Sequence, residues 1–567
     1  MNLSTDLLWE VFDFVAKPNE SQTGRKFMKS TANDWNRGMK QERGQFAGFT
    51  IICILLASSA ALIVLVATSS YGLALSPDSA SYVSAARSLT AGNGLTSHKL
   101  VPLTWYPPLY PFILSLIETL FGLDPVNGAR LLSAASFGLI VLLSGQLFRT
   151  YLATPSLIYF GITATLFSPI LFRVSTYAWT EPLLIVWTLL FMLVLRDYLG
   201  RRSVGLLLLL AFVAGMASLT RYIGIACAVA GVIAILFNNR SPYRSRLFHL
   251  FLFGIVSATP LGAWAVRNYL VAQELMGDYG PSRYNLFHNM YFASIEVFSW
   301  FFPIDLLADR LPYTRVHFVL GTILGCLVGA VFRPWRVSKR IKETLCHIAP
   351  VLLFSGAYIT LLVTASTLWA LEKISSRFMS PVYVPVVLFV LCYIDLSLPS
   401  SAHPLSLRIL GFSLRVKVAN LVAVILVAFL TFSFSQVAGA AGQLMQYGGD
   451  YMDVSWRTSE TVSFLEDQLF SRDDVESIFS NDPEAVYFHT GYSVPSSPEA
   501  QRYCSGEARR PVSTIVEEWP GRHSVLLVWF EETDRSYLFD VDELRQIAEF
   551  SVVASFEDGM VYKVSTR

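Results

Sequence analysis

Two carboxylates, Asp78 and Glu181, lie where a side chain could act on a substrate. Asp78 follows Ser76 and Pro77, residue types typical of the N-cap and first position of a helix, so it falls in the first helical turn. Tyr82 lies one turn later on the same face. A carboxylate in such a place can take a proton from an acceptor hydroxyl or bind a cation. The alternative is that each acid only complements the dipole of its helix.

Basic and aromatic residues at the borders of apolar segments form a second group of candidates. They are Arg221, Tyr222, Arg267 and Arg377, together with Arg283 in the loop after Arg267. Several guanidinium groups that converge on one cavity would bind a phosphate or pyrophosphate in a bidentate manner. Each arginine taken alone is equally explained as an anchor at the membrane surface.

Three further candidates follow the predicted helix of Asp78. His98 and Lys99 could contact a phosphate, or they could form part of a solvated loop. Tyr106 comes directly before Pro107 and Pro108, where the chain stiffens, and we count it among the candidate substrate contacts.

The composition indicates that a membrane protein carries these residues. Of 567 residues, 53% are hydrophobic and only 15% are charged, with a mean hydropathy of +0.48, whereas soluble domains average about 25% charged residues. Many segments of about 18–22 residues run without a charge, which is enough to cross a bilayer as a helix. We predict an α-helical polytopic membrane protein with eleven spans and, at 107–122, a short apolar helix at the membrane surface. The predicted spans lie near 47–69, 129–149, 154–172, 180–196, 204–220, 222–238, 247–266, 316–332, 347–366, 380–397 and 417–438.

The loops between these spans give the chain an orientation. Lys and Arg are frequent before the first span and in alternate loops after it, and all of these loops share one side if there are eleven spans. Basic loops stay in the cytoplasm, so we expect a cytoplasmic N-terminus and an extracytoplasmic C-terminus. The candidate residues then lie at the outer side. Charged residues deep inside the spans are almost absent, which argues against a proton pump or a voltage sensor.

Three regions follow from this division. They are a cytoplasmic arm at 1–45, a transmembrane domain at 46–440 whose first outer loop is 70–128, and a small outer α/β domain at 441–567. The last region alternates strand-like runs such as AVYFHT and SVLLVWF with helix-like runs such as SETVSFLEDQLF. The net charge of +1 gives no indication of nucleic-acid binding.

Three segments carry a resemblance to a known class of enzymes. DSASYVSAARSLTAGNGL, YPPLYPFILSLIETLFG and GARLLSAAS resemble membrane glycosyltransferases of the GT-C class, and are most similar to aminoarabinose transferases and protein O-mannosyltransferases. The resemblance covers about 47–440. It implies a sugar donor on a polyprenyl-phosphate carrier, used at the outer face with inversion, with Asp78 as the catalytic base and Glu181 as a second acid.

The same resemblance leaves the acceptor open. Protein O-mannosyltransferases carry paired acids in the first outer loop, whereas Asp78 is followed here by Ser79, so a lipid or glycan acceptor is better supported than a protein. No cofactor is certain, and a divalent cation at Asp78 and Glu181 stays open.

Two other functions remain as alternatives. A transporter of lipid-linked glycans would need polar groups at mid-membrane, which are scarce here. An O-antigen ligase or polymerase would depend on a later outer loop, in which Arg283 and His288 lie.

Overall fold

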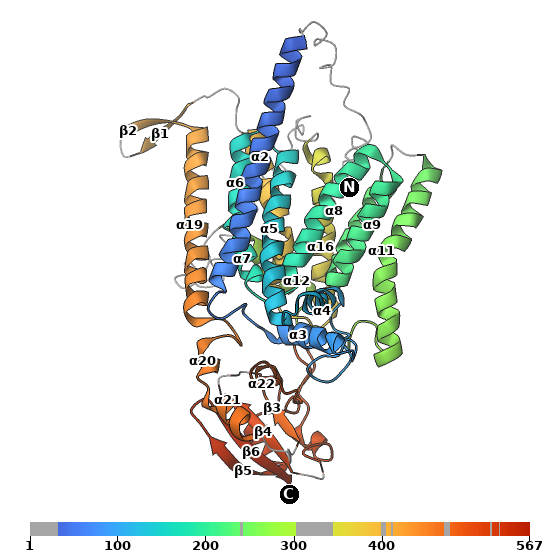
Figure 1. The fold of residues 1–567 in the computed structure, drawn as a ribbon, viewed down its shortest axis with the longest axis vertical. Coiled ribbons are helices and arrows are strands. Elements are labelled where there is room, and N and C mark those ends of the chain that lie inside the picture. The colour runs from blue at the N-terminus through green and yellow to red at the C-terminus, as the bar shows by residue number, and fades with distance from the viewer. Residues whose placement is uncertain are drawn as a thin grey trace.

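The fold is that of a helical bundle with a small sheet domain at one end (Figure 1). The computed structural model describes residues 32–238, 242–301, 344–397, 404–409, 412–469, 477–521, 524–531, 533 and 535–567. Most of the predicted arm at 1–45 and the predicted span at 316–332 lie outside these residues. The remaining part of the arm belongs to α2, which continues from Ala32 without a break into the first predicted span.

Every other predicted span falls on a helix of the bundle. These helices are α2 (Ala32–Ala67), α5 (Pro125–Tyr151), α6 (Pro155–Leu166), α7 (Pro169–Ser175), α8 (Glu181–Arg201), α9 (Val204–Thr220), α10 (Ile225–Leu236), α11 (Tyr243–Ala272), α16 (Ala349–Leu368), α18 (Tyr383–Ser397) and α19 (Val418–Tyr447). Among the described residues, seven helices are long and apolar enough to cross a membrane, or eight if one bent pair counts as a span. Since α9 and α10 are shorter, with 17 and 12 residues, the total of eleven stays a prediction.

The predicted span at 154–172 contains a break that the sequence analysis did not predict. The chain forms two helices there, α6 and α7, whose axes differ in direction by 43°. Ser168 caps the second helix by accepting a hydrogen bond from the backbone N–H of Leu171 at 3.3 Å. Pro169 has no N–H to continue α6 and disfavours a helical conformation at Ser168. The break turns α7 toward the end of the bundle that carries the site.

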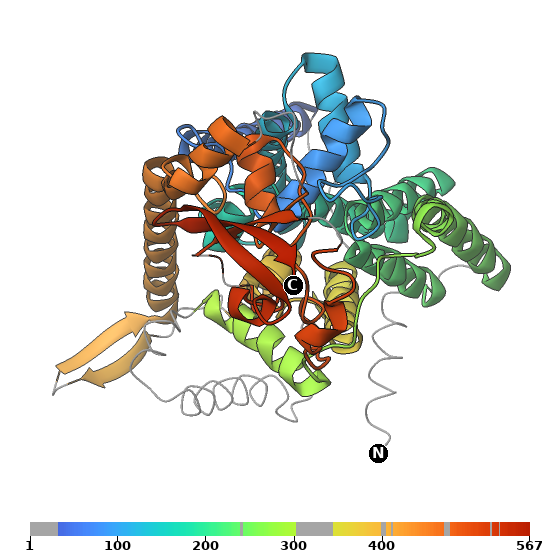
Figure 2. The same cartoon turned by 90° about the horizontal axis from the view of Figure 1, so that it is seen from below.

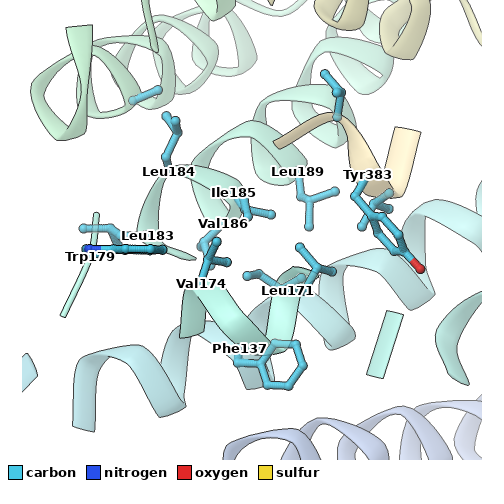
Figure 3. Close-up of a cluster of buried hydrophobic side chains, with 14 of the residues drawn as sticks. Phe137, Leu171, Val174, Trp179, Leu183, Leu184, Ile185, Val186, Leu189 and Tyr383 are labelled. Carbon is cyan, nitrogen blue, oxygen red and sulfur yellow. The ribbon is translucent and has the colours of Figure 1, made fainter. Parts of the chain in front are cut away.

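A buried cluster of apolar side chains fixes α7 against α8. Figure 3 shows Leu171 and Val174 of α7 facing the row Leu183–Leu189 of α8, with Phe137 of α5 beside them. Trp179 belongs to the same cluster and lies in the short connection between the two helices. The connection is therefore held by the bundle core rather than free to move.

Short helices lie across the end of the bundle next to the sheet domain. They are α3 (Pro77–Thr90), α4 (Leu109–Phe121) and α12 (Leu286–Ser299). Three one-turn segments lead into longer helices: η2 (Tyr222–Gly224) into α10, and α17 (Ser376–Met379) with η3 (Ser380–Val382) into α18. As predicted, α3 begins after Ser76, whose backbone N–H and side chain pair with Ser79 in a capping box. Helix α4 coincides with the predicted surface helix and turns Tyr110 and Leu114 inward.

The C-terminal domain is built on a four-stranded sheet in the order β3-β4-β6-β5. Within this sheet only β3 and β4 run parallel, with Ile478 aligned to Leu526. Strands β4 and β6 are antiparallel, with Val525 aligned to Val564. Its elements are α20 (Val454–Arg457), α21 (Glu460–Phe464), η4 (Leu465–Leu469), β3 (Ile478–Ser480), α22 (Pro483–Thr490), η5 (Val512–Ile515), β4 (Val525–Phe530), α23 (Val541–Leu544), β5 (Ala548–Ser555) and β6 (Gly559–Thr566). A hairpin of β1 (Pro404–Ile409) and β2 (Phe412–Lys417) precedes α19.

The mixed helix and sheet content agrees with the α/β domain that the sequence predicts, with one correction. The run AVYFHT is not a strand but most of helix α22. Asp482 caps this helix and Pro483 occupies its first turn, so strong helix-start signals precede the run. Figure 2 shows the domain seated over the end of the bundle, beside α3 and α12.

Candidate active site

Two chain segments far apart in sequence meet where α3 and α8 begin. The backbone N–H of Ala74 donates to the carbonyl of Thr176 at 2.9 Å, and that of Ala178 donates to the carbonyl of Ala74 at 3.1 Å. The indole N–H of Trp179 donates to Ser76 Oγ at 2.7 Å, which ties the connection to the cap of α3. These bonds place the first turn of α3 next to the first turn of α8.

Asp78, Glu181, Arg221 and Arg377 meet at this junction in one network. Arg377 donates through Nη2 to Asp78 Oδ2 at 2.5 Å and through Nε to Glu181 Oε1. Arg221 donates to the same Glu181 oxygen, and to Thr180 Oγ1 at 3.3 Å. The guanidinium carbon of Arg377 also lies 4.0 Å from the ring centre of Trp179. Two acids and two arginines thus hold each other in fixed positions.

The second oxygen of Asp78 is held by Tyr106. The phenol donates to Asp78 Oδ1 at 2.6 Å, and its ring packs edge-on against Tyr82 with the centres 4.8 Å apart. Burial raises the pKa of Asp78, but the charge of Arg377 and the hydrogen bond from Tyr106 outweigh it, so this pKa lies below its ordinary value. Burial and the charge of Asp78 raise the pKa of Tyr106 well above its ordinary value. Asp78 is therefore ionised and Tyr106 keeps its proton at neutral pH.

The two acids differ in their access to substrate. The side chain of Asp78 is 21% exposed and lines a cavity of about 1310 Å³. The side chain of Glu181 is only 2% exposed and does not line it, because Arg377 lies between its carboxylate and the cavity. The geometry therefore supports Asp78 as a group that touches substrate, and it gives Glu181 the different role of positioning the two arginines.

The same arrangement does not fit the divalent cation considered from the sequence. A cation would have to share the oxygens of Asp78 and Glu181, yet the positive guanidinium of Arg377 already bridges these two carboxylates. No group of three or more His, Cys, Asp or Glu side chains suited to a metal ion occurs in the described part of the chain.

Two predicted substrate contacts hold the first outer loop instead. Tyr222 donates its hydroxyl to the carbonyl of Thr104 at 2.6 Å. Arg267 donates to the carbonyls of Leu103 at 2.7 Å and Leu95 at 3.2 Å. Both side chains donate hydrogen bonds to backbone carbonyls of the loop that carries Tyr106. They therefore hold the cavity wall in shape and do not face a ligand.

Three other candidates lie against the C-terminal domain. His98 Nε2 is 3.2 Å and Lys99 Nζ is 3.6 Å from Glu484 Oε1, so both residues of the first loop bind this domain. Arg283 follows Ser282, which pairs with Ser505 of the domain, and neither Arg283 nor His288 lines the cavity. Other residues of this loop, Asp278 and Tyr279 among them, do line the cavity, so the loop borders it without the two residues expected for a ligase or polymerase.

Arg173 is a site residue that the sequence analysis missed. It lies on α7 and lines the cavity, as do Ile170 and Val174 of the same helix. Among the described residues, each other cation that lines the cavity is bonded to a carboxylate, and Arg173 makes no such ion pair. The signal was an arginine directly after a predicted outer span end, where basic residues are disfavoured.

Comparison with known proteins gives one family match over part of the chain and several similar folds. Residues 106–264 match the family described as dolichyl-phosphate-mannose-protein mannosyltransferase. No curated protein matches the chain. ArnT from Cupriavidus metallidurans bound to undecaprenyl phosphate is similar in structure, with 16% identity over 90% of this chain and 97% of that chain and a TM-score of 0.49. The arabinofuranosyltransferase AftD from Mycobacteria is similar at 12% identity, over 91% of this chain and 40% of that chain, with a TM-score of 0.49.

The family match confirms the predicted resemblance to membrane glycosyltransferases. It covers the part of the chain that runs from Tyr106 through Glu181 and Arg221 to Trp264. Together with the apolar helices, it makes the chain an integral membrane glycosyltransferase.

Proposed function

We propose that the chain moves a sugar from a polyprenyl-phosphate carrier to an acceptor hydroxyl, with inversion, at the outer face of a prokaryotic plasma membrane. The observation that carries this proposal is Asp78, an ionised carboxylate that faces a large cavity while Arg377 and Tyr106 hold its oxygens. The family description, which names a dolichyl-phosphate donor, supports a carrier of this class.

The donor phosphate binds at Arg173 and Arg377. Both guanidinium groups line the cavity, and a guanidinium group matches the geometry of phosphate oxygens. Arg173 interacts with Tyr177 and with the charge of Asp450 but makes no ion pair among the described residues, so a phosphate meets weaker competition there than at Arg377, which binds two carboxylates. Ile170 and Val174, which lie before and after it, give the first isoprene units an apolar surface.

The prenyl chain leaves the cavity toward the lipid between α7 and α19. Gln436 of α19 lines the cavity together with the residues of α7. Farther along α19, Val424, Ile425 and Val427 are exposed, as expected of side chains that face lipid. An amphipathic donor can thus keep its chain in the membrane and its phosphate at the bundle end.

Asp78 acts as the base in a single displacement. The acceptor oxygen forms a bond to the anomeric carbon while the bond from that carbon to the phosphate oxygen breaks, and the electron pair leaves with the polyprenyl phosphate. The hydroxyl proton passes to Asp78. Arg173 and Arg377 balance the charge that develops on the leaving phosphate.

Arg377 couples donor binding to the strength of this base. Its charge is the largest of the effects that lower the pKa of Asp78. When the guanidinium turns toward the donor phosphate, Asp78 loses part of this effect and its pKa rises. The carboxylate then accepts a proton more readily, so Asp78 becomes a stronger base only when a donor is present.

The substitution Asp78→Asn tests the proposal. We expect transfer to fall by about 10²- to 10⁴-fold, since an amide cannot accept the proton. Native mass spectrometry of gently purified protein should find polyprenyl phosphate on the wild type and the sugar-loaded carrier on the variant, which binds the donor without using it. Asp197→Asn, at the far end of α8, is the matched control and should behave as the wild type. Full activity of Asp78→Asn, or only ordinary phospholipids on both proteins, would refute the proposal.

A further inference from the structure

The cavity is larger than one donor headgroup requires. Its volume of about 1310 Å³ exceeds the range of about 300–1,000 Å³ that is typical of pockets for one small molecule. One wall belongs to the bundle end and contains Asp78, Arg173 and Arg377, and the facing wall belongs to the C-terminal domain. The facing wall is therefore available to a second ligand.

The facing wall offers only polar and aromatic groups. Of the described residues at 441–567 that line the cavity, none is aliphatic, and tyrosines, carboxylates, arginines and hydroxyls make up the set. The lipid side of the cavity, in contrast, includes Ile170 and Val174. The facing wall therefore suits a ligand that is rich in hydroxyl groups and has no long hydrocarbon chain.

Two pairs of aromatic rings border this part of the cavity. Tyr503 and Tyr537 meet edge to face with centres 5.1 Å apart, and Tyr503 is 55% exposed. Trp105 and Tyr279, from two loops of the bundle, meet in the same way at 4.6 Å, and Trp105 is 46% exposed. All four residues line the cavity. Exposed rings of this kind provide flat apolar surfaces for the C–H faces of sugar rings, while their polar ends remain in water.

Carboxylates next to the rings provide acceptors for sugar hydroxyls. Tyr503 donates its hydroxyl to Glu372 Oε1 at 3.0 Å, which leaves the second oxygen of Glu372 for a ligand. Glu499 also lines the cavity. Glu372 lies in the loop that leads to Arg377, and burial together with the charge of Asp78 raises its pKa. The aromatic wall thus continues to the place where the sugar would be transferred.

We infer that the acceptor is a carbohydrate, and that its terminal sugar units bind at Tyr503, Tyr537 and Glu372, with Trp105 and Tyr279 on the other side. This inference rests on the proposed function and names the substrate class of the same cavity. A sugar hydroxyl that points from Glu372 toward Asp78 is the group that receives the transferred sugar.

The sheet of the C-terminal domain does not favour a peptide acceptor in this cavity. An extended peptide binds most readily by adding a strand to a free sheet edge. At the β3 edge, Ser480 already pairs with Ser496, and no residue of the other edge strand, β5, lines the cavity. A peptide would therefore lack main-chain partners here.

Saturation-transfer NMR with the full-length protein in nanodiscs tests this inference. The probes are neutral oligosaccharides of two to six units released from bacterial envelope polysaccharides, a Ser/Thr-rich peptide and phospholipid vesicles. We expect saturation of sugar C–H protons by the wild type. Tyr503→Ala should weaken oligosaccharide binding roughly tenfold, whereas Tyr503→Phe, which keeps the ring, should bind within about threefold of the wild type.

A matched control and a second readout separate this inference from the proposed function. Tyr492→Ala removes an exposed tyrosine of the same domain outside the cavity and should leave oligosaccharide binding unchanged. If polyprenyl phosphate binds but no oligosaccharide does, or if Tyr503→Ala matches the wild type, the carbohydrate site is refuted and the proposed function stands. Specific binding of the peptide instead would also refute it. If polyprenyl phosphate itself fails to bind, the proposed function falls first.

Discussion

Asp78 and Glu181 show that the neighbours of a carboxylate decide what it can do. Both acids lie in the first turn of a helix and both bind Arg377. Only Asp78 reaches the cavity. Its second oxygen accepts a hydrogen bond from the neutral phenol of Tyr106 rather than from another arginine. If Arg377 moves from Asp78 to a phosphate, the hydrogen bond from Tyr106 still holds Asp78 in place. Glu181 cannot leave its two arginines without leaving buried charges unpaired.

Removing the hydroxyl of Tyr106 should change the pH dependence of transfer. In Tyr106→Phe, Asp78 loses a hydrogen bond that lowers its pKa, so this pKa rises. Because the ionised carboxylate is the active form, the acidic limb of the plot of kcat/KM against pH should move to higher pH. Tyr110→Phe is the control, since Tyr110 packs on the same ring of Tyr82 but gives no hydrogen bond to Asp78. An unmoved acidic limb would contradict the assignment of Asp78 as the base.

Much of the site could be predicted from residue type and place in sequence, but not the use of each residue. Asp78 stood out because it follows Ser76 and Pro77 in the first turn of a predicted helix, and Arg377 because basic residues at outer span ends are disfavoured. Arg267 stood out for the same reason, yet it binds loop carbonyls. Whether a cation meets a carbonyl, a carboxylate or open space depends on the path of the loops. Sequence patterns do not give that path, and Arg173 was overlooked for the same cause.

At the scale of helices and strands, the length and hydrophobicity of a segment predicted well where helices lie, but predicted poorly where a helix breaks or whether a short segment is a strand. The predicted spans fall on helices wherever the structure describes them, because a long apolar run has no other stable form in a membrane. The break between α6 and α7 was missed because Pro169 lies within an uninterrupted apolar run. The helix α22 was taken for a strand because Val486 and Tyr487, like their neighbours, are buried on several sides, which hides the helical period.

Helix α4 should lie at the membrane surface with one stripe in the lipid. Phe112, Leu116 and Leu120 recur every four residues on its exposed side, which is the spacing of a single helix face. A spin label at Leu120 should be accessible to oxygen and protected from a water-soluble nickel complex. A label at Asn93, in the polar turn after α3, is the control and should show the reverse. Equal accessibility to the nickel complex at both positions would place α4 in water.

At the scale of the whole molecule, the cavity exists only while the C-terminal domain stays on the bundle. Glu484 is buried, and it binds His98 of the first loop at 3.2 Å and Arg535 of its own domain at 2.7 Å. Burial raises the pKa of Glu484, but His98 and Arg535 outweigh it, so this pKa lies below its ordinary value. Its stabilising effect is therefore complete at neutral pH and is lost only as the pH falls below the ordinary range of a carboxyl group.

Replacing this one acid should loosen the domain. Glu484→Gln removes the anion that Lys99 and Arg535 bind and weakens the hydrogen bond with His98. This should cost about 2 kcal/mol or more and lower the unfolding midpoint of the C-terminal domain by roughly 5–10 °C. Asp542→Asn breaks only the exposed pair with Arg545 and should shift the midpoint by about 2 °C at most. Differential scanning fluorimetry of the full-length protein checks both values. Equal midpoints for the two variants would mean that Glu484 does not hold the domain.

The side of the membrane on which the cavity opens decides which pool of carrier the enzyme can use. Two native cysteines report on it, since Cys504 lies beside Tyr503 in the C-terminal domain and Cys346 lies near the other end of the bundle, before α16. Both are partly exposed, whereas Cys53, Cys227 and Cys392 are buried. On intact cells, a membrane-impermeant maleimide at mildly alkaline pH should label Cys504, and Cys346 only after permeabilisation. Burial raises the pKa of Cys504, so the alkaline pH supplies its thiolate.

Peptide mapping assigns each label, and Cys504→Ser removes the outer one as a control. The opposite pattern, with Cys346 labelled on intact cells, would mean that the cavity opens toward the cytoplasm. Asp78 and the two arginines would then meet the carrier on the cytoplasmic side, where an acceptor outside the membrane could not reach them. The labelling result therefore tests three inferences together. They are the orientation inferred from Lys and Arg in short loops, the carbohydrate site at Tyr503 and the use of the proposed donor at the outer face.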